Sequence, residues 1–178
     1  MQKAFIIAAT VGVAVAAAFV APAILRQEPP SFYDPQLKIA FSPPPGWKQV
    51  PPPDELRQRY SGGDRRLVAH FQGTNPGDRC NILAFASSER LLPLREKTLK
   101  HDLNFQHRVL DDCWARVDNV PAWFYEYIVK EGPVSIRSLM VVIDRGDRKV
   151  VLHFEGAAAG IEKQSELISK SISSLRLD

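Results

Sequence analysis

The fold of this chain is decided by residues 121–154, whose sequence is PAWFYEYIVKEGPVSIRSLMVVIDRGDRKVVLHF. Extended runs rich in β-branched and aromatic residues alternate here with short connections that contain glycine, a pattern that predicts an antiparallel meander. The predicted strands are residues 121–129, 135–143 and 148–154. In the middle strand Met140 and Val142 lie on one face and Val141 and Ile143 on the other, because side chains alternate with a period of two. A strand that is apolar on both faces predicts that both sides of its sheet are covered.

Two helices are predicted to supply this cover. The tail over residues 161–175 is amphipathic, because its apolar residues recur at helical spacings of seven, four and three. These residues are Ile161, Ile168, Ile172 and Leu175. Upstream, residues 93–105 predict a second helix, with Pro93 in its first turn. Its expected apolar stripe is Leu92, Leu99 and Leu103.

Further strands are predicted before the meander. Residues 56–60 and 66–72 flank the turn-forming cluster at residues 61–64, which predicts a hairpin. Residues 81–87 and 107–117 are two more strand candidates. Together these elements predict an α+β fold, an α/β/α sandwich whose central, mainly antiparallel sheet is flanked by helices.

A proline-rich segment precedes these strands. Triple-proline runs at residues 43–45 and 51–53 flank Gly46 and Trp47, and proline excludes a helix there. Two interpretations remain open at this point. The segment is either a ligand for a module with an aromatic groove, or a rigid edge of the domain with Trp47 folded into the core.

The chain begins with an apolar leader helix. Residues 4–25 carry no charged side chain, and Lys3 precedes them. Ala21 and Ala23 suit the small-residue subsites of a signal peptidase, which predicts that residues 1–23 are cleaved as a signal peptide. The same run is long enough to span a bilayer as a helix, so an uncleaved membrane anchor is the alternative.

Both alternatives predict an extracytoplasmic domain, secreted or periplasmic if the leader is cleaved and membrane-anchored if it is not. We expect residues 24–36 to form a proline-containing linker and residues 37–178 to form the sandwich domain. The chain has 178 residues, 45% hydrophobic and 24% charged, which is the composition of one globular domain. Its formal charge of +3 is too small to indicate binding to nucleic acid.

The chain contains two cysteines, Cys80 and Cys113. An oxidising compartment permits them to join, so the sequence predicts a disulfide. The alternative is a pair of free thiols.

The residues that carry chemistry do not form a familiar motif. The sequence lacks the nucleophile elbow, the zinc-protease motif, the phosphate-binding loop and the dinucleotide fingerprint. The histidines are His70, His101, His107 and His153. His70 and His153 fall in predicted strands and meet only if those strands pair. Asp111 and Asp112 are adjacent, which in extended chain places them on opposite faces, and we expect them in a solvated loop. The sequence therefore predicts no catalytic residue, metal ligand or cofactor.

Three aromatic residues are a candidate binding surface. Trp123, Tyr125 and Tyr127 lie on one face of the first meander strand by the period of two. They form either an exposed platform for a partner or a glycan, or the core beneath a helix.

The order of these elements resembles the PsbP-like family. The resemblance is carried by residues 39–47 (IAFSPPPGW), 118–123 (DNVPAW), 150–154 and 171–175 (SISSL), and it spans about residues 37–177. Where the family has a glycine before its meander, this chain has Asn119 or Val120. The resemblance implies an α/β/α sandwich and a binding or assembly subunit without a shared catalytic set.

These observations predict a non-enzymatic extracytoplasmic binding or assembly domain. Its expected partner is another envelope protein or a small ligand, with no nucleic acid, and with membrane contact only through the N-terminal segment. The alternative is an extracytoplasmic hydrolase or metal-dependent enzyme that uses a site of histidines and aspartates.

Overall fold

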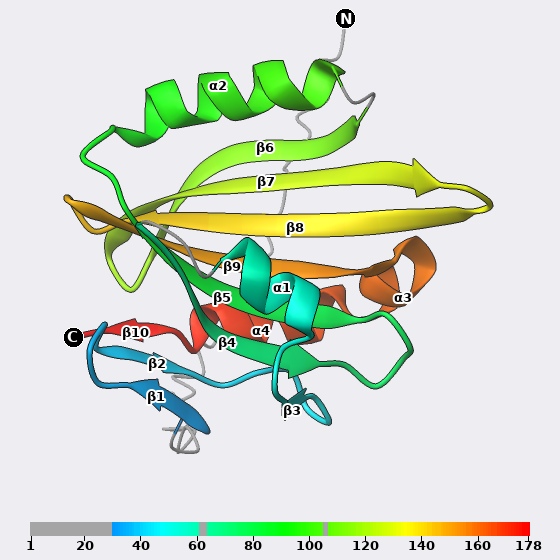
Figure 1. The fold of residues 1–178 in the computed structure, drawn as a ribbon, viewed down its shortest axis with the longest axis horizontal. Coiled ribbons are helices and arrows are strands. Elements are labelled where there is room, and N and C mark those ends of the chain that lie inside the picture. Colours follow the sequence, from blue (N-terminus) through cyan, green and yellow to red (C-terminus); the bar gives the residue numbers. More distant parts are fainter. Residues whose placement is uncertain (1–29, 61–63, 105–106) are drawn as a thin grey trace, which may run out of the picture.

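The computed structural model describes residues 30–60, 64–104 and 107–178 (Figure 1). The predicted leader, with Ala21 and Ala23, lies outside the described residues. Among the residues that are described, no helix is both long enough and apolar enough to cross a membrane.

A seven-stranded antiparallel sheet forms the centre of the molecule. Its strands, in spatial order, are β3 (Lys48–Gln49), β4 (Arg65–Gln72), β5 (Arg79–Ala86), β9 (Arg148–Ala157), β8 (Val134–Asp144), β7 (Val120–Glu131) and β6 (Arg108–Val117). The predicted meander is β7, β8 and β9, and each of these strands is longer than predicted. All neighbouring strands pair antiparallel, so the chain passes back and forth across one continuous surface.

Helices cover the two faces of this sheet. On one face, which we call the front face, lie α1 (Asp54–Arg59), drawn in front of the sheet in Figure 1, and α2 (Leu91–Asn104), drawn above β6 and β7. On the opposite face lie α3 (Ala158–Lys163) and α4 (Ser165–Ser173). Buried Leu91 of α2 packs with Val142, whereas buried Ile168 of α4 packs with Val141 and Ile143, the two faces expected for β8. The α+β fold and the α/β/α sandwich are confirmed.

A small second sheet closes the face covered by α3 and α4. It consists of β1 (Phe32–Asp34), β2 (Ile39–Phe41) and β10 (Arg176–Leu177), with β2 in the middle. Ile39 and Phe41 are fully buried in the larger of two hydrophobic clusters. Phe32 also enters this cluster, with its ring edge-on to Phe71 at 5.8 Å. Because β1 lies inside the predicted linker of residues 24–36, the folded part of the chain begins earlier than residue 37.

The sequence predictions for residues 56–60 and for the start of the α2 stripe are wrong. Residues 56–60 are not a hairpin strand, because helix α1 begins directly after Pro53. Asp54 and Glu55 lie in its first turn, where carboxylates interact favourably with the helix dipole. The apolar stripe of α2 begins one residue earlier than predicted, because Leu91 is buried and Leu92 is 53% exposed.

The tail is two helices rather than one. The break lies at Gln164, between α3 and α4. The Gln164 side chain accepts a hydrogen bond from Trp47 Nε1 at 2.9 Å and donates one to Asp78 Oδ2 at 2.7 Å. Trp47 is 6% exposed, in agreement with the interpretation that the proline-rich segment is a rigid edge with its tryptophan in the core.

The turn between β6 and β7 is a two-residue hairpin. Asp118 and Asn119 have φ angles of 49° and 64°, the left-handed conformation that Asn and Asp tolerate better than most residues. Asn119 therefore takes the conformation that a glycine would otherwise supply at this turn.

The predicted disulfide is wrong. Cys80 is a buried free thiol on β5, and Cys113 is an exposed free thiol on β6. Strands β9, β8 and β7 lie between them, which separates the two cysteines by roughly 19 Å at about 4.8 Å per strand. A disulfide requires Cα atoms within about 7 Å of each other.

Candidate functional site

A pocket lies on the front face of the sheet between α1 and α2, and we call it the α1–α2 pocket. It has a volume of about 220 Å³. Its residues come from the end of α1, from α2 and from five strands: Tyr60, Arg65, Leu83, Ala84, Phe85, Leu94, Thr98, Trp123, Met140, Val142 and Val151. Most of these side chains are apolar, so the pocket suits an apolar guest.

The floor of the pocket follows from strand register. Trp123 of β7 is opposite Val142 of β8, Val142 is opposite Val151 of β9, and Val151 is opposite Leu83 of β5. Residues directly opposite each other in a sheet point to the same face. The four side chains therefore form one apolar row across the sheet, beneath the space between the two helices.

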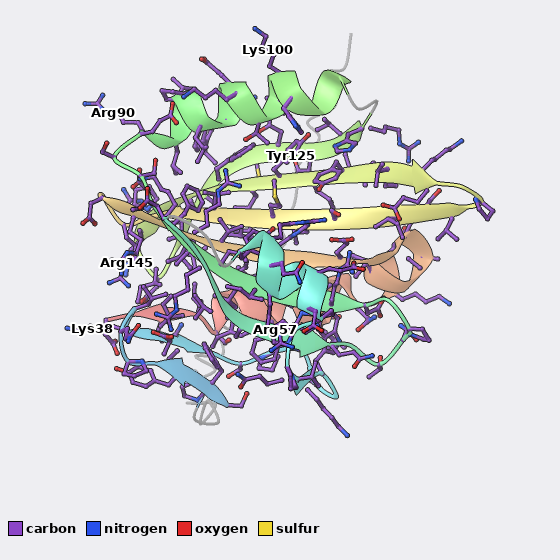
Figure 2. All side chains as sticks on the ribbon, viewed as in Figure 1. Lys38, Arg57, Arg90, Lys100, Tyr125 and Arg145 are labelled. Carbon is purple, nitrogen blue, oxygen red and sulfur yellow. The ribbon has the colours of Figure 1, made fainter. Side chains whose placement is uncertain are left out.

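The predicted aromatic surface lies next to this floor. Trp123 stacks on Tyr125 with ring centroids 5.2 Å apart, and Tyr125 is 5.2 Å from Tyr127. Tyr127 in turn stacks on His107 at 4.8 Å. Trp123 and Tyr125 are 1% and 0% exposed, and Tyr125 lies in the layer between α2 and the sheet, while Lys100 of α2 points away from it (Figure 2).

An exposed aromatic platform is therefore not formed. The structure places Trp123 and Tyr125 in the core beneath a helix, because α2 packs across them through Leu91 and Leu94. Trp123 still lines the α1–α2 pocket, so a role in binding a small ligand stays a prediction.

A polar contact fixes α2 and the Trp123 indole. Asp112 Oδ1 accepts hydrogen bonds from Arg95 Nε at 2.8 Å and from Trp123 Nε1 at 2.7 Å. The Arg95 guanidinium, together with the indole N–H, lowers the pKa of the Asp112 carboxyl. The indole is therefore held by a charged acceptor, and its ring is kept at the pocket floor.

The adjacent carboxylates do not form a pair. Asp111 and Asp112 lie on strand β6 and not in the predicted loop. Asp112 faces α2, whereas Asp111 is opposite Glu126 on the other side of the sheet, as alternation in extended chain predicts. General acid–base chemistry shared between the two carboxylates is excluded by this placement.

The histidines do not meet either. His70 Nδ1 lies 2.7 Å from Asn81 Oδ1 within the sheet. His153 lies on β9, and burial lowers the pKa of its imidazole. Strand β5 separates β4 from β9, which places the two histidines roughly 10 Å apart. In the part of the chain that the structure describes, no group of three His, Cys, Asp or Glu side chains is placed to hold a metal ion.

The rim of the pocket does not follow from the sequence pattern. Tyr60 ends α1 and Arg65 begins β4, so both flank the glycine-containing turn that was interpreted as a hairpin. Arg65 is exposed, and within the described residues no carboxylate is paired with it. The alternating apolar residues of β8 did indicate the floor, but no signal in the sequence placed a helix at residues 54–59 across from α2.

A second depression, of about 430 Å³, lies against β3 and β4. Its lining includes Pro51, Pro52, Val68 and His70, and it contains no Phe, Tyr or Trp ring. The α1–α2 pocket is the better candidate, because aromatic and aliphatic side chains supply most of the affinity of ligand sites.

A seven-stranded antiparallel sheet with two helices on each face defines the chain as an α/β/α sandwich of the PsbP-like fold. Cyanobacterial PsbP (CyanoP) from Synechocystis sp. PCC 6803 superposes with a TM-score of 0.60 at 15% identity, over 83% of this chain and 91% of that protein. LpqN of Mycobacterium tuberculosis, a protein involved in cell envelope biogenesis, has a TM-score of 0.57 at 10% identity, over 79% and 83%.

PA94 of Pseudomonas aeruginosa, a protein of unknown function and putative regulator, has a TM-score of 0.53 at 9% identity, over 74% and 97%. No family model matches the chain, and no curated protein matches it by sequence. At these identities the likeness is one of backbone arrangement. The resemblance seen in the sequence is thus confirmed at the level of the fold.

Proposed function

We propose that the chain is a non-enzymatic extracytoplasmic binding domain whose α1–α2 pocket takes a compact apolar ligand that carries an acidic group. The observation that carries the proposal is the row of apolar side chains beneath this pocket, with Arg65 at its rim. The expected sources of such a ligand are a small molecule or a side chain of another envelope protein.

The size and lining of the pocket set the class of ligand. Its volume of about 220 Å³ is smaller than the roughly 300–1,000 Å³ of sites for drug-sized molecules, so one or two fused rings or a short acyl chain would fill it. Burial of such a body against Trp123 and Val142 supplies about 25 cal/mol per Å² of apolar surface. Arg65 then favours a carboxylate or sulfonate over a neutral head group.

The placement of the titratable groups supports binding rather than catalysis. Asp112 is engaged by Arg95 and Trp123, and His70 by Asn81. Among the residues that the structure describes, no carboxylate and no imidazole lines the α1–α2 pocket. The apolar leader of the sequence supports an extracytoplasmic location. The structural likeness to LpqN, a protein of cell envelope biogenesis, supports the same location.

Calorimetric titration with 2-naphthoate and with its uncharged counterpart 2-naphthylmethanol tests the proposal. Both compounds are expected to bind, the acid more tightly. Arg65→Gln is expected to weaken binding of the acid about tenfold, equivalent to about 1.4 kcal/mol, and to leave the alcohol unchanged. Arg59→Gln is the matched control, because Arg59 is an exposed cation of α1 that does not line the pocket.

A second variant tests the pocket itself. Met140 is half-buried at the pocket floor, so Met140→Trp places an indole in the free space and is expected to abolish binding of both compounds. Thermal unfolding of this variant is expected to show that the fold is kept. If Met140→Trp bound the compounds as tightly as the wild type does, the assignment of the pocket as the binding site would be overturned. Chemical conversion of the acid during incubation would overturn the non-enzymatic role.

A further inference from the structure

Strand β6 is an open edge of the large sheet. It ends the strand order, and in the described residues no strand pairs with its outer side. Eight of its ten residues are exposed, and only Asp112 and Val117 are not. Exposure of both faces and of the outer edge is unusual for a strand of this length.

Exposed apolar side chains gather along this edge. Of the six large hydrophobic residues that are exposed in the described chain, four lie on β6 or on the adjoining α2. They are Leu92, Val109, Leu110 and Trp114. Trp114 is 50% exposed, and exposed apolar residues that cluster mark sites of protein association.

Strand register shows which backbone groups face outward. In the two-residue hairpin, Val117 and Val120 flank the turn as a hydrogen-bonded pair, and such pairs alternate along β6. Arg116, opposite Pro121, is therefore a non-hydrogen-bonded position, as the missing N–H of proline requires. By the same alternation Asp112, Trp114 and Arg116 direct their N–H and C=O groups away from β7. The Asp112 N–H is bonded to Asp111 Oδ1 at 2.8 Å, which leaves the Asp112 carbonyl and both groups of Trp114 and Arg116 for a partner strand.

We propose that this edge binds a second copy of the chain, antiparallel, with Trp114 opposite the partner's Trp114. A two-fold axis perpendicular to the sheet keeps every side chain on its own face. Since residues that are opposite each other must have side chains on the same face, the axis must place one residue of β6 opposite the same residue of the partner. With Trp114 on the axis, Asp112 lies opposite the partner's Arg116 and Arg116 opposite the partner's Asp112. Asp112 already accepts three hydrogen bonds, from Arg95 and Trp123, and a carboxylate has about four acceptor sites, so it has room for one more donor. The Arg116 guanidinium, which donates to the Asn119 carbonyl at 2.6 Å in the monomer, has further N–H groups for this contact. Opposite charges that face each other across strands stabilise the pair.

The neighbouring registers lack this match. An axis at Asp112 would place two carboxylates opposite each other, and an axis at Arg116 would place two guanidinium groups opposite each other, which is destabilising. Axes at Cys113 and at Ala115 would place Trp114 opposite Asp112 and opposite Arg116, respectively, and would pair no opposite charges within β6. An axis at Leu110 would place Arg108 opposite Asp112, but it falls on the irregularity between Val109 and Asp111, where the regular alternation of β6 is interrupted. The segment Asp112-x-Trp114-x-Arg116 is therefore self-complementary in one register.

The other edge of the sheet explains why association stops at two copies. Strand β3 has two residues, with triple-proline runs at residues 43–45 and 51–53 on either side. Proline cannot donate to a strand ladder, so this edge does not pair with a further copy. Pairing through β6 alone gives a closed two-fold dimer rather than a filament.

Disulfide trapping tests the proposed register. With Trp114 on the axis, Cys113 lies opposite the partner's Ala115 at a non-hydrogen-bonded position, where the Cα atoms are close enough for a disulfide. Ala115→Cys in the full-length chain is expected to form a covalent dimer on mild oxidation, read on a non-reducing gel. Ala115→Cys combined with Cys113→Ser is the matched control and is expected to stay monomeric, as buried Cys80 does not react.

Sedimentation of the full-length chain in mild detergent tests the charge match. Arg116→Glu places a carboxylate opposite the partner's Asp112, so it is expected to weaken dimerisation at least tenfold. Arg108→Glu is the control: it lies on the same strand but outside the segment 112–116, and it is expected to leave dimerisation unchanged. The wild type sedimenting as a monomer at 100 µM would overturn the proposal. So would dimerisation that is equal in Arg116→Glu and the wild type, or trapping that persists without Cys113.

Discussion

The two edges of the large sheet are built in opposite ways. Strand β3 has two residues and lies between two triple-proline runs, whereas β6 has ten residues and contains no proline. Each edge carries a tryptophan in or beside its strand, but Trp47 is 6% exposed and Trp114 is 50% exposed. The same residue type therefore belongs to the core at one edge and to the surface at the other.

Both residues of β3 are exposed, but Trp47 beside the strand is held in the core by a partly buried polar network. Trp47 donates to Gln164, and Gln164 donates to Asp78, whose carboxylate also accepts from Asn75 at 2.7 Å. The space around Asp78 is full, since a Cβ atom added at Gly156 would lie 2.3 Å from Asp78 Oδ1. The proline runs keep the short strand β3 from pairing with another chain, and the network keeps Trp47 in the core.

Apart from its ladder with β7, strand β6 is held to α2 by the hydrogen bonds between Asp112, Arg95 and Trp123. Beyond these contacts the strand extends from the body of the sandwich with both faces exposed. The comparison shows that one edge of a sheet can be protected from pairing while the other stays open to it. The sequence in and around each edge strand decides which of the two it is. Three predictions test the comparison, from the largest expected effect to the smallest.

Trp47→Ala is expected to destabilise the chain by about 3–5 kcal/mol, as for other buried aromatic residues. The loss combines removal of the ring, whose centroid is 6.1 Å from that of Phe154, with the loss of a donor to Gln164. Urea unfolding measures the change. Trp47→Phe keeps a ring but removes the indole N–H, so it is expected to lose less, and equal losses in the two variants would show that the network contributes most of the stability.

Asp112→Asn is expected to cost about 1 kcal/mol at pH 7, because it removes a charged acceptor shared by Arg95 and Trp123. The folded-state pKa of Asp112 lies below its ordinary value of about 3.9, so its stabilising effect is full above that pH and is lost as the pH falls through the folded-state pKa. The difference in unfolding free energy between wild type and variant should therefore shrink from pH 7 to pH 3.

The control for this variant is Arg95→Gln, which removes the other partner. If the difference between Asp112→Asn and the wild type were constant across this pH range, the ion pair would not be what fastens β6 to α2. Hydrogen exchange of β6 amides is the second measurement, and it is expected to rise in both variants.

The sequence predicts the parts of this molecule that depend on local periodicity. The meander and both faces of β8 follow from the alternation of apolar residues, and α2 follows from its stripe, because period and burial are coupled in one segment. Residues 56–60 are predicted as a strand because the start of the helix at Asp54 is indicated only by Pro53 and two acidic residues. The break at Gln164 depends on contacts with Trp47 and Asp78, which are far away in the sequence.

The candidate site could be predicted only in part for the same reason. The aromatic residues of β7 share a face, as expected, but whether they are exposed depends on the position of α2, which the sequence does not encode locally. The predicted disulfide failed because two cysteines on one sheet can still be separated by three strands. The order of the strands in the sheet depends on the whole chain, so the sequence separation of Cys80 and Cys113 does not predict it.

Trp114→Ala is expected to change the stability of the monomer by no more than about 0.5 kcal/mol, since substitutions of exposed residues away from special features seldom do more. The measurement is urea unfolding at a concentration below that of dimerisation, beside Trp47→Ala, so that one residue type is compared at the two edges. The same variant is expected to weaken the dimer, because it removes the pair of indoles on the proposed two-fold axis. A large loss of monomer stability would mean that Trp114 belongs to the core, and the contrast between the edges would fail. A small loss of monomer stability together with a weaker dimer would assign Trp114 to association, because its indole would then stabilise the dimer and not the monomer.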